Sequence, residues 1–108
     1  CADYITSVGN VSGSSTMSVK PTSADVYIVQ PEDDVVILKA PGSVIVSLPA
    51  TRDGRVLNIK ASPACSQQNP VSIMPTNGQT VDGQEFYSMI FPRSAITLVQ
   101  CDDEWLIL

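Results

Sequence analysis

Short apolar runs separated by polar turns recur along the chain from residue 25 onwards. Each run is of strand length, is rich in Val and Ile, and is closed by Gly, Pro, Asn or Asp. This alternation is typical of β-strands, and no segment shows convincing helical spacing. The pattern predicts strands at residues 26–30, 34–40, 43–48, 55–61, 70–74, 79–82, 85–91, 94–101 and 104–108.

Turn signals separate these runs by roughly 8 to 12 residues, the spacing typical of a sandwich or small barrel. Asn77-Gly78 and Asp82-Gly83 are strong turn formers, because these residues tolerate the positive φ that tight turns need. The predicted fold is therefore all-β: a small sandwich or prism-like domain of short antiparallel strands.

The chain divides into two regions by composition. Residues 1–24 are rich in Ser, Thr and Gly, which favours a linker or an extended lead-in strand. Residues 25–108 hold the predicted strands and form the folded domain. Cys1 stands where a complete chain would begin with Met, so we expect an excised or processed piece of a longer protein.

Two strand patterns are apolar on both alternating faces: residues 35–38 and residues 105–108. A sheet with one solvated face would alternate apolar and polar residues, so both faces of these strands are expected to be covered. A small domain has few residues with which to cover the second face of these strands. We therefore favour a homo-oligomer that shares its core, with Val36, Leu38, Leu106 and Leu108 at the subunit interface. A closed monomeric sandwich with doubly buried central strands is the alternative.

Composition excludes several classes of protein. The chain has 108 residues, which is the size of one domain, with 44% hydrophobic and 16% charged residues. Such a composition is not that of a disordered chain. The net charge of −5 and the scattered basic residues argue against nucleic acid as a partner. No apolar stretch approaches the roughly 20 residues of a membrane-spanning helix, and the N-terminus lacks the features of a signal peptide.

Reactive side chains are scarce, and we expect no enzymatic activity. Without histidine, Ser-His-Asp and Cys-His mechanisms are excluded. Paired carboxylates such as Asp33 with Asp34 fit solvated turns better than a glycosidase site. The run from Asp102 to Glu104 lacks the spacing of a calcium loop. No catalytic residue, metal site or cofactor is predicted.

Three cysteines cannot all pair within one chain. Cys101 lies in an apolar strand pattern, which favours a buried, inert thiol, whereas Cys65 lies in a polar loop and is expected to be accessible. A disulfide between Cys65 and Cys101 stays open, because sequence alone does not determine pairing.

The order of several short motifs resembles β-structured domains of phage tail fibres, tailspikes and other viral attachment fibres. The motifs are Leu48-Pro49-Ala50, the segments 54–60 and 69–75, Gly78 to Gly83, Ala95 to Val99, and the ending that begins at Trp105. The resemblance spans roughly residues 25–108. The chain departs from it at Asp102-Asp103-Glu104, where a Gly-containing turn is common, and in the loop around Cys65.

The resemblance implies a trimeric domain of a virion surface fibre or spike that serves assembly and attachment to a host-surface glycan or protein receptor. Exposed loops with aromatic and polar residues are the usual contacts on such scaffolds. The expected receptor contacts are Phe86, Tyr87, Gln67, Gln68 and Asn69. The alternatives are a carbohydrate-binding module of an extracellular protein and a purely structural virion component.

Overall fold

The computed structural model describes residues 17–49, 53–76 and 78–108. Residues 1–16 of the predicted lead-in and Asn77 of a predicted turn lie outside them. The described residues form ten strands and no helix, so the all-β prediction is confirmed. The strands are β1 (Val19–Thr22), β2 (Val26–Ile28), β3 (Val35–Leu38), β4 (Val44–Ser47), β5 (Val56–Lys60), β6 (Val71–Met74), β7 (Thr80–Val81), β8 (Tyr87–Met89), β9 (Ala95–Cys101) and β10 (Glu104–Ile107).

Each of the nine predicted strands contains one of the observed strands. The tenth, β1, lies in the segment assigned to the lead-in and pairs with β3 along its whole length. An extended lead-in strand was one of the two forms expected for that segment, and its last residues adopt it.

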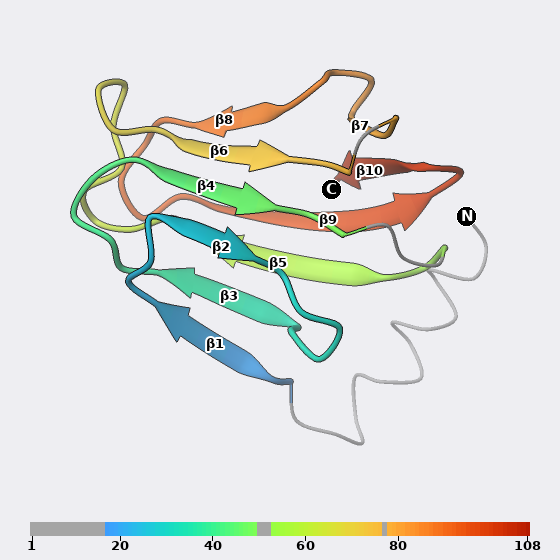
Figure 1. The fold of residues 1–108 in the computed structure, drawn as a ribbon, viewed down its shortest axis with the longest axis horizontal. Helices are drawn as coiled ribbons and strands as arrows, with labels where there is room; N and C mark the ends of the chain where they lie inside the picture. The colour runs from blue at the N-terminus through green and yellow to red at the C-terminus, as the bar shows by residue number, and fades with distance from the viewer. Residues whose placement is uncertain (1–16, 50–52, 77) are drawn as a thin grey trace.

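The strands form two sheets that lie one in front of the other (Figure 1). The six-stranded sheet has the order β1-β3-β5-β9-β10-β7, and the four-stranded sheet has the order β2-β4-β6-β8. From β1 to β6 the chain alternates between the sheets, and successive strands within each sheet stack in parallel. This coiling suggests a β-solenoid of about three turns rather than a sandwich.

The expected antiparallel pairing is wrong for five of the eight pairs that the described strands form, which are parallel. Only β6 with β8, β5 with β9, and β9 with β10 pair in an antiparallel manner. Each antiparallel pair includes β8 or β9, which follow the solenoid turns. There the chain reverses direction, so that β8 runs back along β6 and β9 runs back along β5. Apolar patterning specifies which residues form strands, but it is the same for both directions of pairing.

The core lies between the two sheets and consists of inward residues stacked from turn to turn. Val36 pairs in register with Ile59 in the six-stranded sheet, and Val46 pairs with Ile73 in the four-stranded sheet. All four are at most 1% exposed. Trp105 is completely buried, which confirms the core position expected for it. Burial of such side chains stabilises the fold by roughly 1.5–3 kcal/mol each.

Arg55 fixes the loop that connects β2 to β3. Its guanidinium is buried and donates hydrogen bonds to the backbone carbonyls of Gln30, Pro31 and Asp33. A buried cation needs such acceptors, because removing it from water without them is costly. The three bonds hold the loop between β2 and β3 against the residue that precedes β5.

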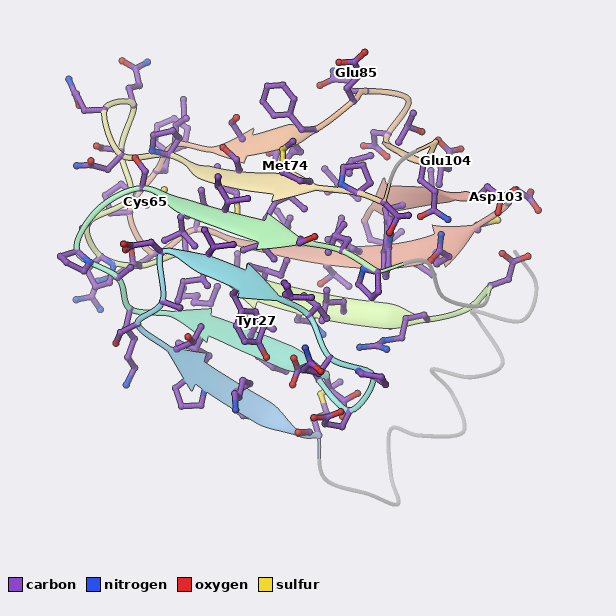
Figure 2. The ribbon with its side chains drawn as sticks, viewed as in Figure 1. Tyr27, Cys65, Met74, Glu85, Asp103 and Glu104 are labelled. Carbon is purple, nitrogen blue, oxygen red and sulfur yellow. The ribbon has the colours of Figure 1, made fainter. Side chains whose placement is uncertain are left out.

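The cysteines differ in part from the expectations: Cys101 is buried as expected, but neither its bonding nor the burial of Cys65 was predicted. Cys65 is free and 1% exposed, because its loop folds inward and its Sγ donates to the carbonyl of Met89 at 3.0 Å. Cys101 is disulfide-bonded rather than an inert thiol. Since Cys65 is free, the disulfide between Cys65 and Cys101 that the sequence left open does not form. Figure 2 marks the position of Cys65 among the side chains.

Candidate functional site

The outer surface of the four-stranded sheet is apolar, and we call it the apolar face. Val26 and Ile28 of β2, Ile45 of β4 and Met74 of β6 point away from the core. Their exposed fractions are 58%, 60%, 46% and 38%, respectively. The face is turned toward the viewer in Figure 2, where Met74 is labelled.

Strand register brings these side chains together. Val26 pairs with Ile45, Ile45 with Ser72, and Ser72 with Ser88, so one row crosses all four strands. In the next row, Ile28 pairs with Ser47, and Ser47 with Met74. The outward positions of β2, β4, β6 and β8 are therefore aliphatic, thioether or serine side chains, without a charge. Contiguous apolar surface of this kind marks interaction sites on soluble proteins.

The outer surface of the six-stranded sheet mixes apolar side chains, such as those of Val19 and Val35, with polar and charged ones. Val35 pairs in register with Asn58, and Asn58 with Thr97, whose hydroxyl donates to the Asn58 side chain at 2.6 Å. Ile37 pairs with Lys60, which is exposed. The four-stranded sheet differs in that none of the outward side chains on its strands is charged.

The four predicted interface residues are not on the apolar face. Val36 and Leu38 are buried in the chain's own core, at 0% and 1% exposure, so a subunit contact on β3 would have to use their neighbours. Leu106 is half-buried, and Leu108 is 62% exposed after the end of β10. The sequence did contain a signal for the apolar face: Val44-Ile45-Val46 is apolar at consecutive positions, as residues 35–38 are.

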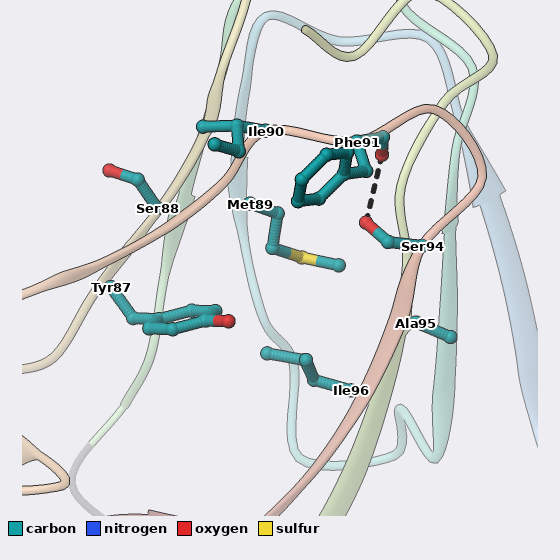
Figure 3. Close-up of a pocket in the computed structure, with 8 residues that line it drawn as sticks. All are labelled: Tyr87, Ser88, Met89, Ile90, Phe91, Ser94, Ala95 and Ile96. Atoms are coloured by element: carbon teal, nitrogen blue, oxygen red, sulfur yellow. Dashed lines mark hydrogen bonds between the residues drawn. The ribbon is translucent and has the colours of Figure 1, made fainter. Parts of the chain in front are cut away.

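An open cavity of about 280 Å³ lies between β8 and β9. Figure 3 shows the side chains of Tyr87, Met89 and Ile96 turned toward one another, with the Phe91 ring beside them. The Ser94 hydroxyl donates to the Phe91 carbonyl at 2.9 Å. The cavity is lined by uncharged residues: Tyr87, Ser88, Met89, Ile90, Phe91, Ser94, Ala95 and Ile96.

The structure separates the predicted receptor contacts. Tyr87 lines the cavity and packs against the core, whereas its neighbour Phe86 is 46% exposed and lies outside the cavity lining. Gln67 and Gln68 are exposed and Asn69 is half-buried in the loop between β5 and β6. The aromatic residue that sequence reasoning missed is Phe91, which is 67% exposed.

A polar cluster surrounds Asp33, which is 2% exposed. Its carboxylate accepts hydrogen bonds from the Tyr27 hydroxyl and from the backbone N–H of Gln30. Burial, the hydrogen bond to Asp33 and the negative charges of Asp33 and Glu32 together raise the pKa of Tyr27 above its ordinary range. These hydrogen bonds, together with the one from Arg55 to the Asp33 carbonyl, hold the loop between β2 and β3 in place.

Within residues 17–49, 53–76 and 78–108, no group of three or more Cys, Asp and Glu side chains is arranged to hold a metal ion. No helix long and apolar enough to span a bilayer occurs there.

The chain was also compared with known proteins. Neither a family model nor a curated protein matches it. The geometry of the apolar face and of the cavity is therefore the basis for the functional proposal.

Proposed function

We propose that this domain is a structural component of a viral fibre or spike, which assembles with copies of itself through the apolar face and contributes to host-surface attachment. The observation that supports assembly most directly is the uncharged outer surface of the four-stranded sheet. The solenoid-like stacking of short strands is compatible with a fibre protein, and the motif order of residues 25–108 resembles such domains.

Burial of the apolar face would contribute to self-association. In a pair of copies, burial of the four half-exposed side chains of each copy would contribute roughly 6–12 kcal/mol, at about half the value of full burial. Association itself costs an estimated 4–15 kcal/mol. The two quantities are similar, so a stable assembly requires contacts beyond these side chains. A trimer, as in the resembling fibres, is the oligomer we propose.

Solution mass tests this function. The wild-type domain is expected to sediment as an oligomer at micromolar concentration, while Ile45→Glu, which places a charge at the centre of the apolar face, is expected to be monomeric. Val19→Glu is the matched control, because it replaces an exposed aliphatic residue with the same charge on β1 of the other sheet. A wild-type domain that stays monomeric at every concentration would contradict the proposal.

A carbohydrate-binding function is a second candidate, and the cavity between β8 and β9 favours it. Its aromatic rings and hydroxyls are the groups with which proteins bind neutral sugar rings, and none of its lining residues is charged. A glycan array probed with the wild-type domain and with Phe91→Ala tests this role. Binding that is lost in the variant supports attachment through the cavity, and absence of any binding favours a purely structural component.

A further inference from the structure

Charged side chains gather at the two ends of the strands. At one end, β3, β5 and β10 begin and β9 finishes, because β9 runs antiparallel to both β5 and β10. Figure 2 shows Asp103 and Glu104 at this end. We call it the acidic end, and it carries Glu32, Asp34, Asp53, Asp102, Asp103 and Glu104.

The opposite end carries the exposed cations. Lys39 directly follows β3, Lys60 is the last residue of β5, and Arg93 precedes β9. Ala95 pairs in register with Lys60, and the backbone N–H of Arg93 donates to Ser62, which places Arg93 close to Lys60. We call this the basic end. Asp25 is the one carboxylate that the described loops place there.

Within the described residues, the nearest cation, Arg55, does not neutralise the charges of the acidic end. Arg55 is buried and directs its hydrogen bonds to backbone carbonyls. The carboxylates of Asp34, Asp53 and Glu104 accept from backbone N–H groups or a hydroxyl, which leaves their negative charge in place.

The partner that matches both ends is a second copy of the chain. We propose that copies associate with the acidic end of one against the basic end of the next, so that charge complementarity sets their orientation at the apolar face. The inference rests on the proposed self-assembly and adds its geometry. Attraction between opposite charges selects orientation and register at interfaces more than it adds affinity.

The arrangement of charges restricts the symmetry axis. In a trimer, rotation by a third of a turn about an axis along the stacking direction of the strands brings the acidic end of each copy to the basic end of the next. Rotation about an axis parallel to the strands would instead place one acidic end over another. Symmetric oligomers of this domain are therefore expected to have their axis along the stacking direction.

Charge reversal tests the inference. Lys39→Glu with Lys60→Glu makes the basic end negative, so that both ends are alike. This variant is expected to weaken self-association at least tenfold in sedimentation equilibrium, with recovery at high salt, which screens repulsion. Adding Glu32→Lys and Asp103→Lys restores the wild-type net charge but leaves both ends negative, so the variant with all four substitutions is still expected to associate more weakly than wild type.

The outcomes separate this inference from the proposed function. Lys20→Glu, on β1 away from both ends, is the control for a change in net charge and is expected to leave association unchanged. A wild-type oligomer that tolerates the reversal of the basic end overturns the end-to-end contact but leaves assembly through the apolar face. Wild-type association of the four-substitution variant, whose net charge is unchanged but whose ends are both negative, also overturns it. A monomeric wild type overturns both.

Discussion

Among single residues, Tyr27 and Asp33 show how a buried polar pair stabilises a solenoid loop. The Tyr27 hydroxyl donates to the Asp33 carboxylate, and the same carboxylate accepts from the backbone of Gln30. Hydrogen bonds to a charged group contribute about 1.5–3 kcal/mol, and leaving the buried carboxylate with one donor fewer is expected to cost a similar amount. Tyr27→Phe should therefore unfold at lower urea concentration than wild type.

The same pair makes stability depend on alkaline pH. The pKa of Tyr27 is raised in the folded chain, so the unfolded chain releases the phenolic proton at lower pH than the folded one. The contribution of Tyr27 to the free energy of unfolding is complete below about pH 10, the ordinary pKa of a tyrosine. It is lost as the pH rises from there toward the raised pKa, at up to about 1.4 kcal/mol per pH unit. Urea unfolding between pH 8 and 11.5 should show this loss in wild type, and a smaller one in Tyr27→Phe. Equal slopes would exclude Tyr27 as its source.

Among the structural elements, the hairpin of β9 and β10 has a turn that its residues fit imperfectly. Cys101 pairs with Glu104, so Asp102 and Asp103 form a two-residue turn, with φ of 53° and 63°. Positive φ at both positions is typical of a type I′ turn, for which Gly is favoured at the second position. Asp tolerates this region better than most residues, but it does so at a cost.

We expect Asp103→Gly to stabilise the domain by about 0.5–1 kcal/mol, because Gly relieves the strain of the left-handed conformation. In a domain of this size the change corresponds to a few degrees in Tm, measurable by calorimetry. Ser23→Gly is the control, an exposed loop residue that is not among those with positive φ. A Tm for Asp103→Gly no higher than that of the control would show that the turn is unstrained.

The strands at the sheet edges differ in how they avoid uncontrolled pairing. The carbonyls of Ser18 and Thr22 accept from the strand that follows in the sheet, so the alternate position, Pro21, has its nitrogen on the free edge of β1. Proline offers no N–H there, and this edge is protected against the addition of another strand. At the free edge of β2, the Gln30 side chain donates to the Ile28 carbonyl. Assembly is therefore expected at the apolar face rather than by edge pairing.

The positions of the strands could be predicted from the sequence, and their arrangement could not. Alternation and turn residues such as Asp82-Gly83 are local, and the structure confirms that turn, with φ of 49° and 79°. Parallel stacking depends on pairing between segments far apart, as between Val44 and Val71, which local patterning does not record. In the all-apolar run at 35–38, the sequence also gave no means of deciding that Val36 and Leu38, rather than Val35 and Ile37, face the core.

At the scale of the whole molecule, the chain has two apolar surfaces, and it buries only one of them itself. The core between the sheets is closed by the chain itself, whereas the apolar face is exposed in a single copy. In the proposed assembly this face is buried only in folded subunits, since unfolded chains do not present it. Self-association therefore stabilises the folded state by mass action.

A dependence of Tm on protein concentration is the expected consequence. When most of the protein is assembled, each tenfold increase in concentration should stabilise the folded subunit by up to about 1.4 kcal/mol, so that Tm rises by a few degrees. Ile45→Glu, which places a charge on the apolar face, should melt at a temperature independent of concentration, whereas Val19→Glu, on the other sheet, should follow wild type. Calorimetry from 5 to 500 μM (roughly two tenfold steps) provides the measurement. A wild-type Tm that does not change over this range would mean that the apolar face contributes nothing to the folded state through contacts between copies.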